Sequence, residues 1–313
     1  MLSGFKPRLK RLLTREEQNV VTGDARPKPE LAQHRAKAEP KAPRRAEEIR
    51  VFEQGRIRLI YEITHRPGRP MVVVFPGVDT QAARCGTSYY GLQWQLDATV
   101  VHIHDNFGAH GNYLLQTAGE PEVRWAVAAL LRQLMAETGT KPKDLWLTGT
   151  SKGATTALCI ALLLKSGNCI AGEPQILLGD FLFPENRDWR QLEDLRSIVY
   201  AMTGRVDIED KPALNNLVPS ILRNRLHEYR GKALVIFGKQ TGYYGQHIIE
   251  IDRALRQLKQ KDPKARRQVR VTLREEPFRK HIDVVPVYLD VMYRHFGTLD
   301  GTVQSATAPK AAS

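Results

Sequence analysis

Cysteine is scarce in this sequence, and long apolar runs are missing. The three cysteines, Cys85, Cys159 and Cys169, form an odd number without a Cys-x-x-Cys spacing, which argues against a disulfide framework and a structural zinc site. No run approaches the roughly 18 apolar residues of a membrane-spanning helix, and the N-terminus lacks the apolar segment of a secretory signal. These absences predict a cytoplasmic protein without a metal or other cofactor.

The sequence also lacks a dominant basic block, although its formal net charge is +13. Residues 1–49 contain 12 Lys or Arg and 7 Asp or Glu, a surplus of five, and the remaining excess is spread thinly. Nucleic acid binding would require a basic stripe with stacking aromatic residues or a known module, and neither is visible. The basic segment around Phe5 and Leu9 instead predicts contact with a partner protein or with an anionic membrane surface, at the inner face of the membrane.

Composition divides the chain into one large domain and two tails. The contents of 42% hydrophobic and 26% charged residues are typical of a soluble globular protein. Residues 1–49 are rich in Pro, Ala, Lys, Arg and Glu without sustained apolar periodicity, which predicts a disordered tail, and residues 298–313 are expected to be disordered too. Residues 50–297 should therefore form the folded domain.

Within residues 50–297, strand-like and helix-like segments alternate. Short apolar or alternating runs predict strands at 56–63, 71–75, 99–104, 145–148, 175–180, 233–238 and 268–273. Helical spacing predicts helices at 120–138, 154–165, 246–261 and 284–296, and a helical insertion or cap at 184–229, after the strand at 175–180. This alternation implies right-handed crossovers, and hence an α/β fold with a mostly parallel sheet and helices on both faces.

The most informative motif is Gly149-Thr150-Ser151-Lys152-Gly153, between a short strand and a long apolar helix. In an α/β-hydrolase fold a serine in this context is the nucleophile, held on a tight, strained turn above the sheet. The residues two before and two after it must be nearly free of side chains, so that strand and helix can pass closely. The alternatives are a helix start that merely contains serine, or a phosphate-binding turn, for which the longer Gly-rich loop is missing.

A serine nucleophile requires an oxyanion hole and a general base. We expect the backbone N–H of Lys152 to be one oxyanion donor, and the N–H of Val78 or Gly77, in the loop after the strand at 71–75, to be the second. The base should be a histidine between the last strand and the last helix. Of the nine histidines, His281 alone lies there.

The acid that orients this histidine is less clearly marked. The loop after the strand at 233–238 is the usual position, but it contains no carboxylate. Asp180, at the end of its predicted strand, occupies the alternative position in this architecture and keeps the chain order serine, acid, histidine. The other interpretations are a helix-capping role for Asp180, a Ser-His dyad, and Glu250 or Asp283 as the acid.

A polar loop follows the strand at 99–104 and should lie over the same edge of the sheet. Its glycines permit close approach of the backbone to a ligand. Four of its side chains, from Asp105, Asn106, His110 and Tyr113, carry polar groups suited to the hydroxyls of a sugar. We therefore expect substrate binding here, with a purely structural loop as the alternative.

Four features together resemble the XcbB/CpsF family of bacterial capsular polysaccharide biosynthesis proteins. They are Phe-Pro-Gly at 75–77, Asp-x-Phe-Gly-x-x-Gly-x-Tyr at 105–113, Gly-Thr-Ser-Lys-Gly-Ala at 149–154, and the late His281. The related accessory secretory-system acetyltransferases, which O-acetylate sugars on serine-rich glycoproteins, look similar too. The resemblance covers about residues 70–290. It implies an α/β-hydrolase fold and a Ser-acid-His site acting on acyl groups of a glycan, with Ser151 and His281 carried over by position.

These features predict a serine acyltransferase or esterase. Its substrate would be acyl groups, with acetyl as the preferred group, of a bacterial cell-surface or capsular glycan or of an acylated small molecule. In the expected reaction His281 takes the Ser151 proton, an acyl-enzyme forms, and a sugar hydroxyl or water resolves it. The alternative is a non-catalytic protein of the same fold that acts as a scaffold in a polysaccharide biosynthesis or secretion assembly.

Overall fold

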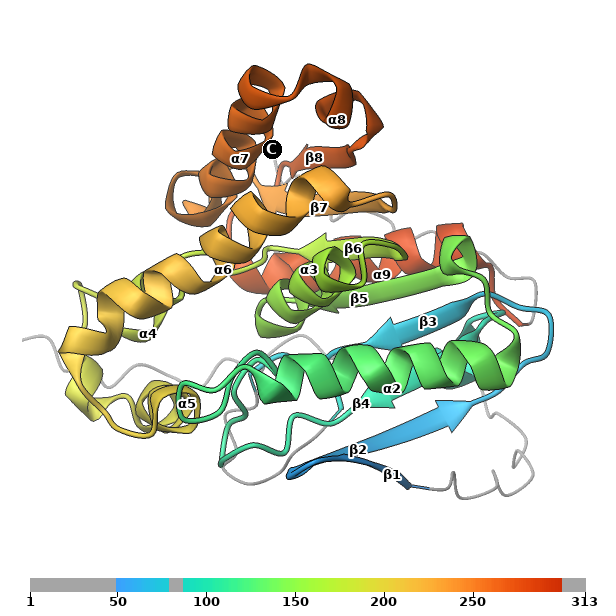
Figure 1. The fold of residues 1–313 in the computed structure, drawn as a ribbon. Coiled ribbons are helices and arrows are strands. Elements are labelled where there is room, and N and C mark those ends of the chain that lie inside the picture. Colours follow the sequence, from blue (N-terminus) through green and yellow to red (C-terminus); the bar gives the residue numbers. More distant parts are fainter. Residues whose placement is uncertain (1–48, 79–86, 300–313) are drawn as a thin grey trace, which may run out of the picture. The chain divides into compact units, whose positions relative to one another are not determined.

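A mostly parallel β-sheet organises the part of the chain that this computed structural model describes, residues 49–78 and 87–299 (Figure 1). In these residues the sheet has eight strands in the order β1-β2-β4-β3-β5-β6-β7-β8. The pairings β1·β2 and β2·β4 are antiparallel, and every later pairing is parallel. The strand bounds are β1 Arg50–Gln54, β2 Ile57–Thr64, β3 Met71–Val74, β4 Thr99–Ile103, β5 Leu145–Thr150, β6 Asn168–Gly172, β7 Lys232–Gly238 and β8 Arg270–Glu276.

Helices cover both faces of the sheet. The α-helices are α1 Leu92–Gln95, α2 Glu122–Thr138, α3 Lys152–Leu164, α4 Leu178–Leu182, α5 Glu193–Thr203, α6 Lys211–Arg225, α7 Ile249–Lys261, α8 Pro263–Gln268 and α9 Val284–Phe296. Short 3-10 turns are η1 Pro142–Asp144, η2 Trp189–Gln191, η3 Ile208–Asp210, η4 Leu226–Glu228 and η6 His281–Asp283, and η5 Tyr244–Ile248 is a π-helical turn. The larger apolar core joins α2, α3, α6 and α7 to one face, while α1 and α9 bury a second cluster on the other.

The strand β3 shows how the sequence builds these two cores. All four of its residues are buried. Successive side chains of a strand point to opposite faces, so Met71 and Val73 join the larger core, whereas Val72 and Val74 join the cluster beneath α9. A strand buried on both faces needs a continuous apolar run rather than an alternating one, and Met-Val-Val-Val supplies it.

The prediction of an α/β fold with a mostly parallel, doubly covered sheet is confirmed. The predicted strand at 175–180 is wrong. The sixth strand in this sheet is Asn168–Gly172, and part of the predicted segment forms α4. Ile176 and Leu178 in this segment pack in the core, and a short apolar run does not distinguish a strand from a buried loop and helix.

The segment between β6 and β7 is helical, with α4, α5 and α6 in succession. Helices were expected there at 184–229, and the first one begins earlier, at Leu178. The predicted tails, 1–49 and 298–313, lie almost entirely outside the described residues. Among the described helices, none combines the length and the apolar character needed to cross a bilayer.

The fold gathers several loops at one edge. The carboxyl ends of parallel strands meet at the same edge of a sheet, where ligands of open α/β folds bind. Ser151 directly follows β5, Glu173 directly follows β6, and the loops after β3 and β4 begin at Phe75 and His104. The candidate site therefore lies at this edge.

Candidate active site

Ser151 occupies a strained turn between β5 and α3. Its backbone angles are φ 54° and ψ −122°, a conformation that costs a residue with a side chain about 1–3 kcal/mol. The turn is held because the Ser151 N–H donates to the Gly172 carbonyl oxygen at 2.8 Å, which ties the elbow to the end of β6. The structure thus places Ser151 in the elbow that the sequence predicts.

The two glycines that flank Ser151 are required by close backbone packing. A Cβ atom on Gly149 would lie 2.6 Å from the carbonyl carbon of Gly153. A Cβ atom on Gly153 would overlap the carbonyl oxygen of Phe75, at the end of β3. Strand and helix therefore approach each other as the motif requires, and α3 also passes against the loop that follows β3.

Glu173 is the carboxylate that holds His281. Its Oε2 lies 2.5 Å from Nδ1 of His281, and its side chain is fully buried. The other carboxylate oxygen, Oε1, accepts hydrogen bonds from the Gly238 N–H at 3.0 Å and from the Thr241 hydroxyl at 2.6 Å. With Nδ1–H donating to Glu173, the neutral imidazole carries its lone pair on Nε2, which is the tautomer that a general base needs.

Asp180 lies elsewhere, so its predicted role as partner of His281 is wrong. It is exposed on α4, where its carboxylate accepts from Asn215 Nδ2 at 3.0 Å and pairs with Lys211 Nζ at 3.1 Å. Burial acts to raise the pKa of Asp180, but the hydrogen bonds from Asn215 and Lys211 outweigh it and leave the pKa lowered. The error in the acid follows from the wrongly predicted strand at 175–180. The sixth strand is Asn168–Gly172, so the residue after it is Glu173.

The other two candidate acids also have separate roles. Glu250 forms an ion pair with Arg253 on the same helix, α7. Asp283 accepts a hydrogen bond from the backbone N–H of Lys280 at 3.2 Å and so caps the turn η6. Neither carboxylate is the partner of His281 Nδ1.

One sequence signal could have identified Glu173. The short apolar run Cys169-Ile170-Ala171 lies a few residues after α3, and it is followed by Gly172 and then a glutamate. The last residue of β7, Gly238, and Thr241 in the loop after it instead supply hydrogen-bond donors to Glu173. The missing carboxylate after β7 therefore does not make the site a Ser-His dyad, because the acid lies after β6 instead.

The ring of His281 is fixed on its other side by stacking. It lies parallel to the ring of Tyr243, with centroids 4.7 Å apart and an interplanar angle of 1°. Behind Tyr243, His247 is buried and its Nδ1 accepts from the N–H groups of Ile176 and Leu177, both at 3.3 Å. Burial lowers the pKa of His247 to about 4, so this imidazole is neutral and structural at neutral pH.

The hydroxyl of Ser151 accepts a hydrogen bond from the side-chain amide of Gln175. The Nε2 to Oγ distance is 3.0 Å. The phenol of Tyr113 donates to Oε1 of the same amide at 2.6 Å, which fixes the amide with its nitrogen toward Ser151. Both Tyr113 and Gln175 are fully buried, so this chain of hydrogen bonds lies beneath the serine rather than in solvent.

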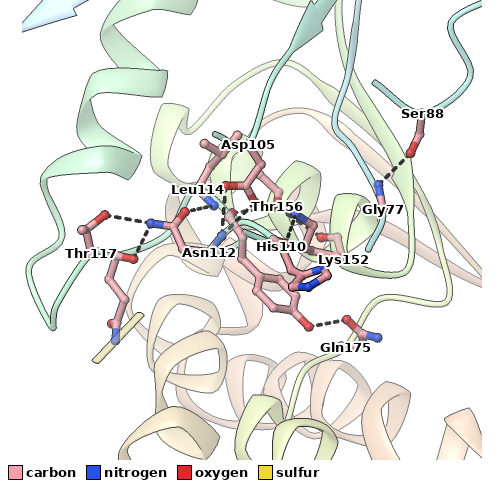
Figure 2. A network of polar contacts seen from close by, with 12 residues as sticks. Gly77, Ser88, Asp105, His110, Asn112, Leu114, Thr117, Lys152, Thr156 and Gln175 are labelled. Atoms are coloured by element: carbon pink, nitrogen blue, oxygen red, sulfur yellow. Dashed lines mark hydrogen bonds and ion pairs between the residues drawn. The ribbon is translucent and has the colours of Figure 1, made fainter. Parts of the chain in front are cut away.

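A buried ion pair links the elbow to the loop after β4 (Figure 2). Nζ of Lys152 lies 2.7 Å from Oδ2 of Asp105 and donates to the His110 carbonyl oxygen at 3.2 Å. The two side chains are 3% and 2% exposed, so neither charge is solvated except by the other and by backbone. The Asn112 N–H also donates to both Asp105 oxygens, and a Cβ on Gly111 would overlap the pair.

These contacts bear on the residues expected to bind substrate. The functional groups of Asp105 and Tyr113 are buried and bonded internally, so their placement favours bracing of the loop over contact with a sugar. His110 is also buried, whereas Asn106 is half-buried and its buried Oδ1 has no hydrogen-bond partner. Substrate binding by this loop stays a prediction, with Asn106 as its best-placed member.

The expected oxyanion donors come from two segments, the start of α3 and the loop after β3. Lys152 is the first residue of α3, where backbone N–H groups have no acceptor within the helix. The Gly77 N–H already donates to Ser88 Oγ at 2.8 Å (Figure 2), which leaves Val78 as the better candidate for the second donor. The oxyanion role of both N–H groups stays a prediction.

The sheet order, the strained serine after β5 and the histidine before the last helix define an α/β protein of the α/β-hydrolase type. No protein-family model matches the chain, and no curated protein sequence matches it. Solved structures do match, at low sequence identity.

One of them is the capsule O-acetyltransferase of Neisseria meningitidis serogroup A, with a TM-score of 0.60 and 16% identity over 79% of this chain and 94% of that chain. The glycosylation-associated Gap123 complex from Streptococcus agalactiae gives a TM-score of 0.59 and 15% identity over 78% of this chain and 45% of that chain. Carboxyl esterase 2 from the fungus Tuber melanosporum gives a TM-score of 0.53 and 15% identity over 80% of this chain and 86% of that chain. These likenesses establish the fold.

Proposed function

We propose that this protein is a serine-nucleophile acyltransferase or esterase. It would act on acyl groups, with acetyl as the preferred group, of a bacterial cell-surface or capsular glycan. The observation that carries the proposal is the pairing of His281 with a fully buried carboxylate, at 2.5 Å, at the edge where Ser151 stands on its strained turn. A purely structural serine would not require that strain, because an ordinary helix N-cap has relaxed backbone angles.

The residues act in sequence on an acyl donor. Ser151 gives its proton to Nε2 of His281 as Oγ attacks the acyl carbonyl, and Glu173 stabilises the imidazolium that forms. The N–H groups of Lys152 and Val78 donate to the oxyanion of the tetrahedral intermediate. His281 then protonates the leaving group, and a sugar hydroxyl or water attacks the acyl-enzyme with His281 as base.

One rearrangement precedes this attack. In the structure the Ser151 hydroxyl bonds to Gln175 and not to His281. Because Oγ accepts this bond, the proton of Ser151 remains available, and rotation about χ1 would direct it toward His281. Hydrogen bonds of catalytic serines are often long or misaligned before substrate binds.

The substrate class is supported by two kinds of likeness. The motifs at 75–77, 105–113 and 149–154 resemble the XcbB/CpsF family, whose members take part in capsule biosynthesis. The structural neighbours include a capsule O-acetyltransferase and an esterase, and a mutant of that O-acetyltransferase is described in complex with CoA. Acetyl-CoA is therefore the first thioester donor to test, beside simple esters.

The test is release of p-nitrophenol from p-nitrophenyl acetate. We expect the wild-type protein to hydrolyse the ester and Ser151→Ala to lose at least about a thousandfold in rate. Ser166→Ala, at the opposite end of α3, is the matched control and should keep the full rate. Equal rates for wild type and Ser151→Ala would overturn the proposal.

The second candidate function is a non-catalytic scaffold of the same fold. It is favoured by the single observation that Ser151 bonds to Gln175 rather than to the imidazole. A fluorophosphonate probe separates the two, because it modifies only a serine activated by its base. Labelling of the wild type that is lost in both Ser151→Ala and His281→Ala supports the enzyme, and absence of labelling supports the scaffold.

A further inference from the structure

A cavity of about 330 Å³ lies on the helical layer, away from Ser151, between α2, α3 and α6. Among the described residues, its lining contains no carboxylate. Leu163 contributes from the last turn of α3, whereas Ser151 precedes the first turn of that helix, and 13 helical residues span about 19 Å. The cavity is therefore separate from the proposed active site.

The cavity is lined by the guanidinium of Arg124. Nε of Arg124, on α2, is buried and has no hydrogen-bond partner, and the guanidinium forms no ion pair with any residue in the described ranges. Burial lowers the pKa of Arg124. The other arginine in the lining, Arg225, is already paired with Glu228 at 3.2 Å. A partly desolvated guanidinium without a carboxylate is unfavourable, and a bound anion would relieve this cost.

The remaining walls define the rest of the ligand. Leu163, Leu217 and Ile221 present apolar side chains, and the Trp125 ring at the rim is 37% exposed. Asn216 accepts from Arg223 through its Oδ1 at 2.5 Å, which turns its amide nitrogen, a donor, to other partners. The cavity therefore combines the Arg124 guanidinium and amide donors with an apolar surface, at the lower end of the size range of small-molecule sites.

We propose that this cavity binds a small organic carboxylate, whose head group pairs with Arg124 and whose aliphatic body packs against Leu217 and Trp125. Guanidinium and carboxylate match in geometry and can form two parallel hydrogen bonds. The inference does not depend on the chemistry of Ser151.

Calorimetry with three probes on the full chain tests both halves of the proposal. Hexanoate carries head and body, acetate carries the head alone, and hexanol carries the body alone. The protein carries Ser151→Ala, so that no turnover contributes to the heat. We expect saturable binding of hexanoate, and binding of acetate and hexanol that is weaker by about tenfold or more. Equal affinity for acetate and hexanoate, or no saturable binding of hexanoate, would overturn the proposal.

Two variants assign the site to Arg124. Arg124→Leu should weaken hexanoate binding by about tenfold or more, whereas Arg132→Leu, an exposed arginine on the same helix, should leave it unchanged. Ser220→Glu places a carboxylate on the cavity wall and should repel hexanoate, which keeps the test decisive if Arg124→Leu does not fold. Undiminished binding in both Arg124→Leu and Ser220→Glu would place hexanoate elsewhere and refute the assignment.

Discussion

At the scale of single residues, the catalytic assignment depends on which carboxylate serves His281. Glu173 has three partners inside the protein, from Gly238, Thr241 and His281, and no exposure to solvent. Asp180 is bonded to Asn215 and Lys211 at the surface of α4. The two acids can therefore be separated by matched substitutions.

Glu173→Gln should lower the rate of ester hydrolysis by about three orders of magnitude with little change in fold. The amide keeps the size of the carboxylate, but it removes the charge that stabilises the imidazolium and can impose the wrong tautomer on His281. Asp180→Asn is the control, expected to stay within about twofold of wild type. A loss in Asp180→Asn equal to that in Glu173→Gln, measured as kcat/KM, would contradict the assignment.

The buried chain from Tyr113 through Gln175 to Ser151 gives a prediction about stability. Gln175→Leu leaves the buried Tyr113 hydroxyl without its acceptor, which should cost about 1–3 kcal/mol of unfolding free energy. Adding Tyr113→Phe removes the orphaned hydroxyl, so the double variant should be more stable than Gln175→Leu alone. Urea unfolding measures both, and additive losses would show that the two side chains do not interact.

At the scale of elements, the sequence predicted the elbow well because its glycines, its serine and the apolar helix are adjacent in the chain. It failed at β6, whose apolar part is only Cys169-Ile170-Ala171. The equally short but more strongly apolar run Ile-Leu-Leu at 176–178 resembled a strand more closely. Because β6 was not predicted, Glu173, which directly follows it, was not considered as the acid. Its identity depends on contacts with Gly238 and Thr241, 65 and 68 residues away, which local periodicity does not encode.

The close passage of α3 against the end of β3 predicts a strong effect of one methyl group. Gly153→Ala should cost about 1–3 kcal/mol and lower activity, because the added Cβ meets the Phe75 carbonyl oxygen and displaces the loop that carries Val78. Gly245→Ala, where a Cβ meets nothing within 4 Å, should change stability by less than about 0.5 kcal/mol. Thermal unfolding of the pair distinguishes the two sites, and similar melting temperatures would count against this packing.

At the scale of the whole molecule, two buried histidines should set its response to acid. Burial lowers the pKa of His102 and of His247 to about 4, from an ordinary value of 6.5. Between about pH 6.5 and pH 4 the unfolded chain binds more protons at these sites than the folded protein does, so the free energy of unfolding falls as pH falls. Each site contributes a loss on the order of 3 kcal/mol, complete near pH 4.

Urea unfolding from pH 8 to pH 4 measures this slope. His247→Asn, whose side-chain oxygen can still accept from the backbone, should flatten the slope, since asparagine does not titrate. His65→Asn, at an exposed position, should leave it unchanged. An unaltered slope in His247→Asn would assign the acid response to other groups.

The hydrogen bonds around Glu173 also affect how this protein could vary. The acid precedes the helical segment from α4 to α6, and its donors Gly238 and Thr241 follow that segment, so one carboxylate joins both ends of it. A change in these helices that moved either end of the segment would therefore reach His281 through Glu173.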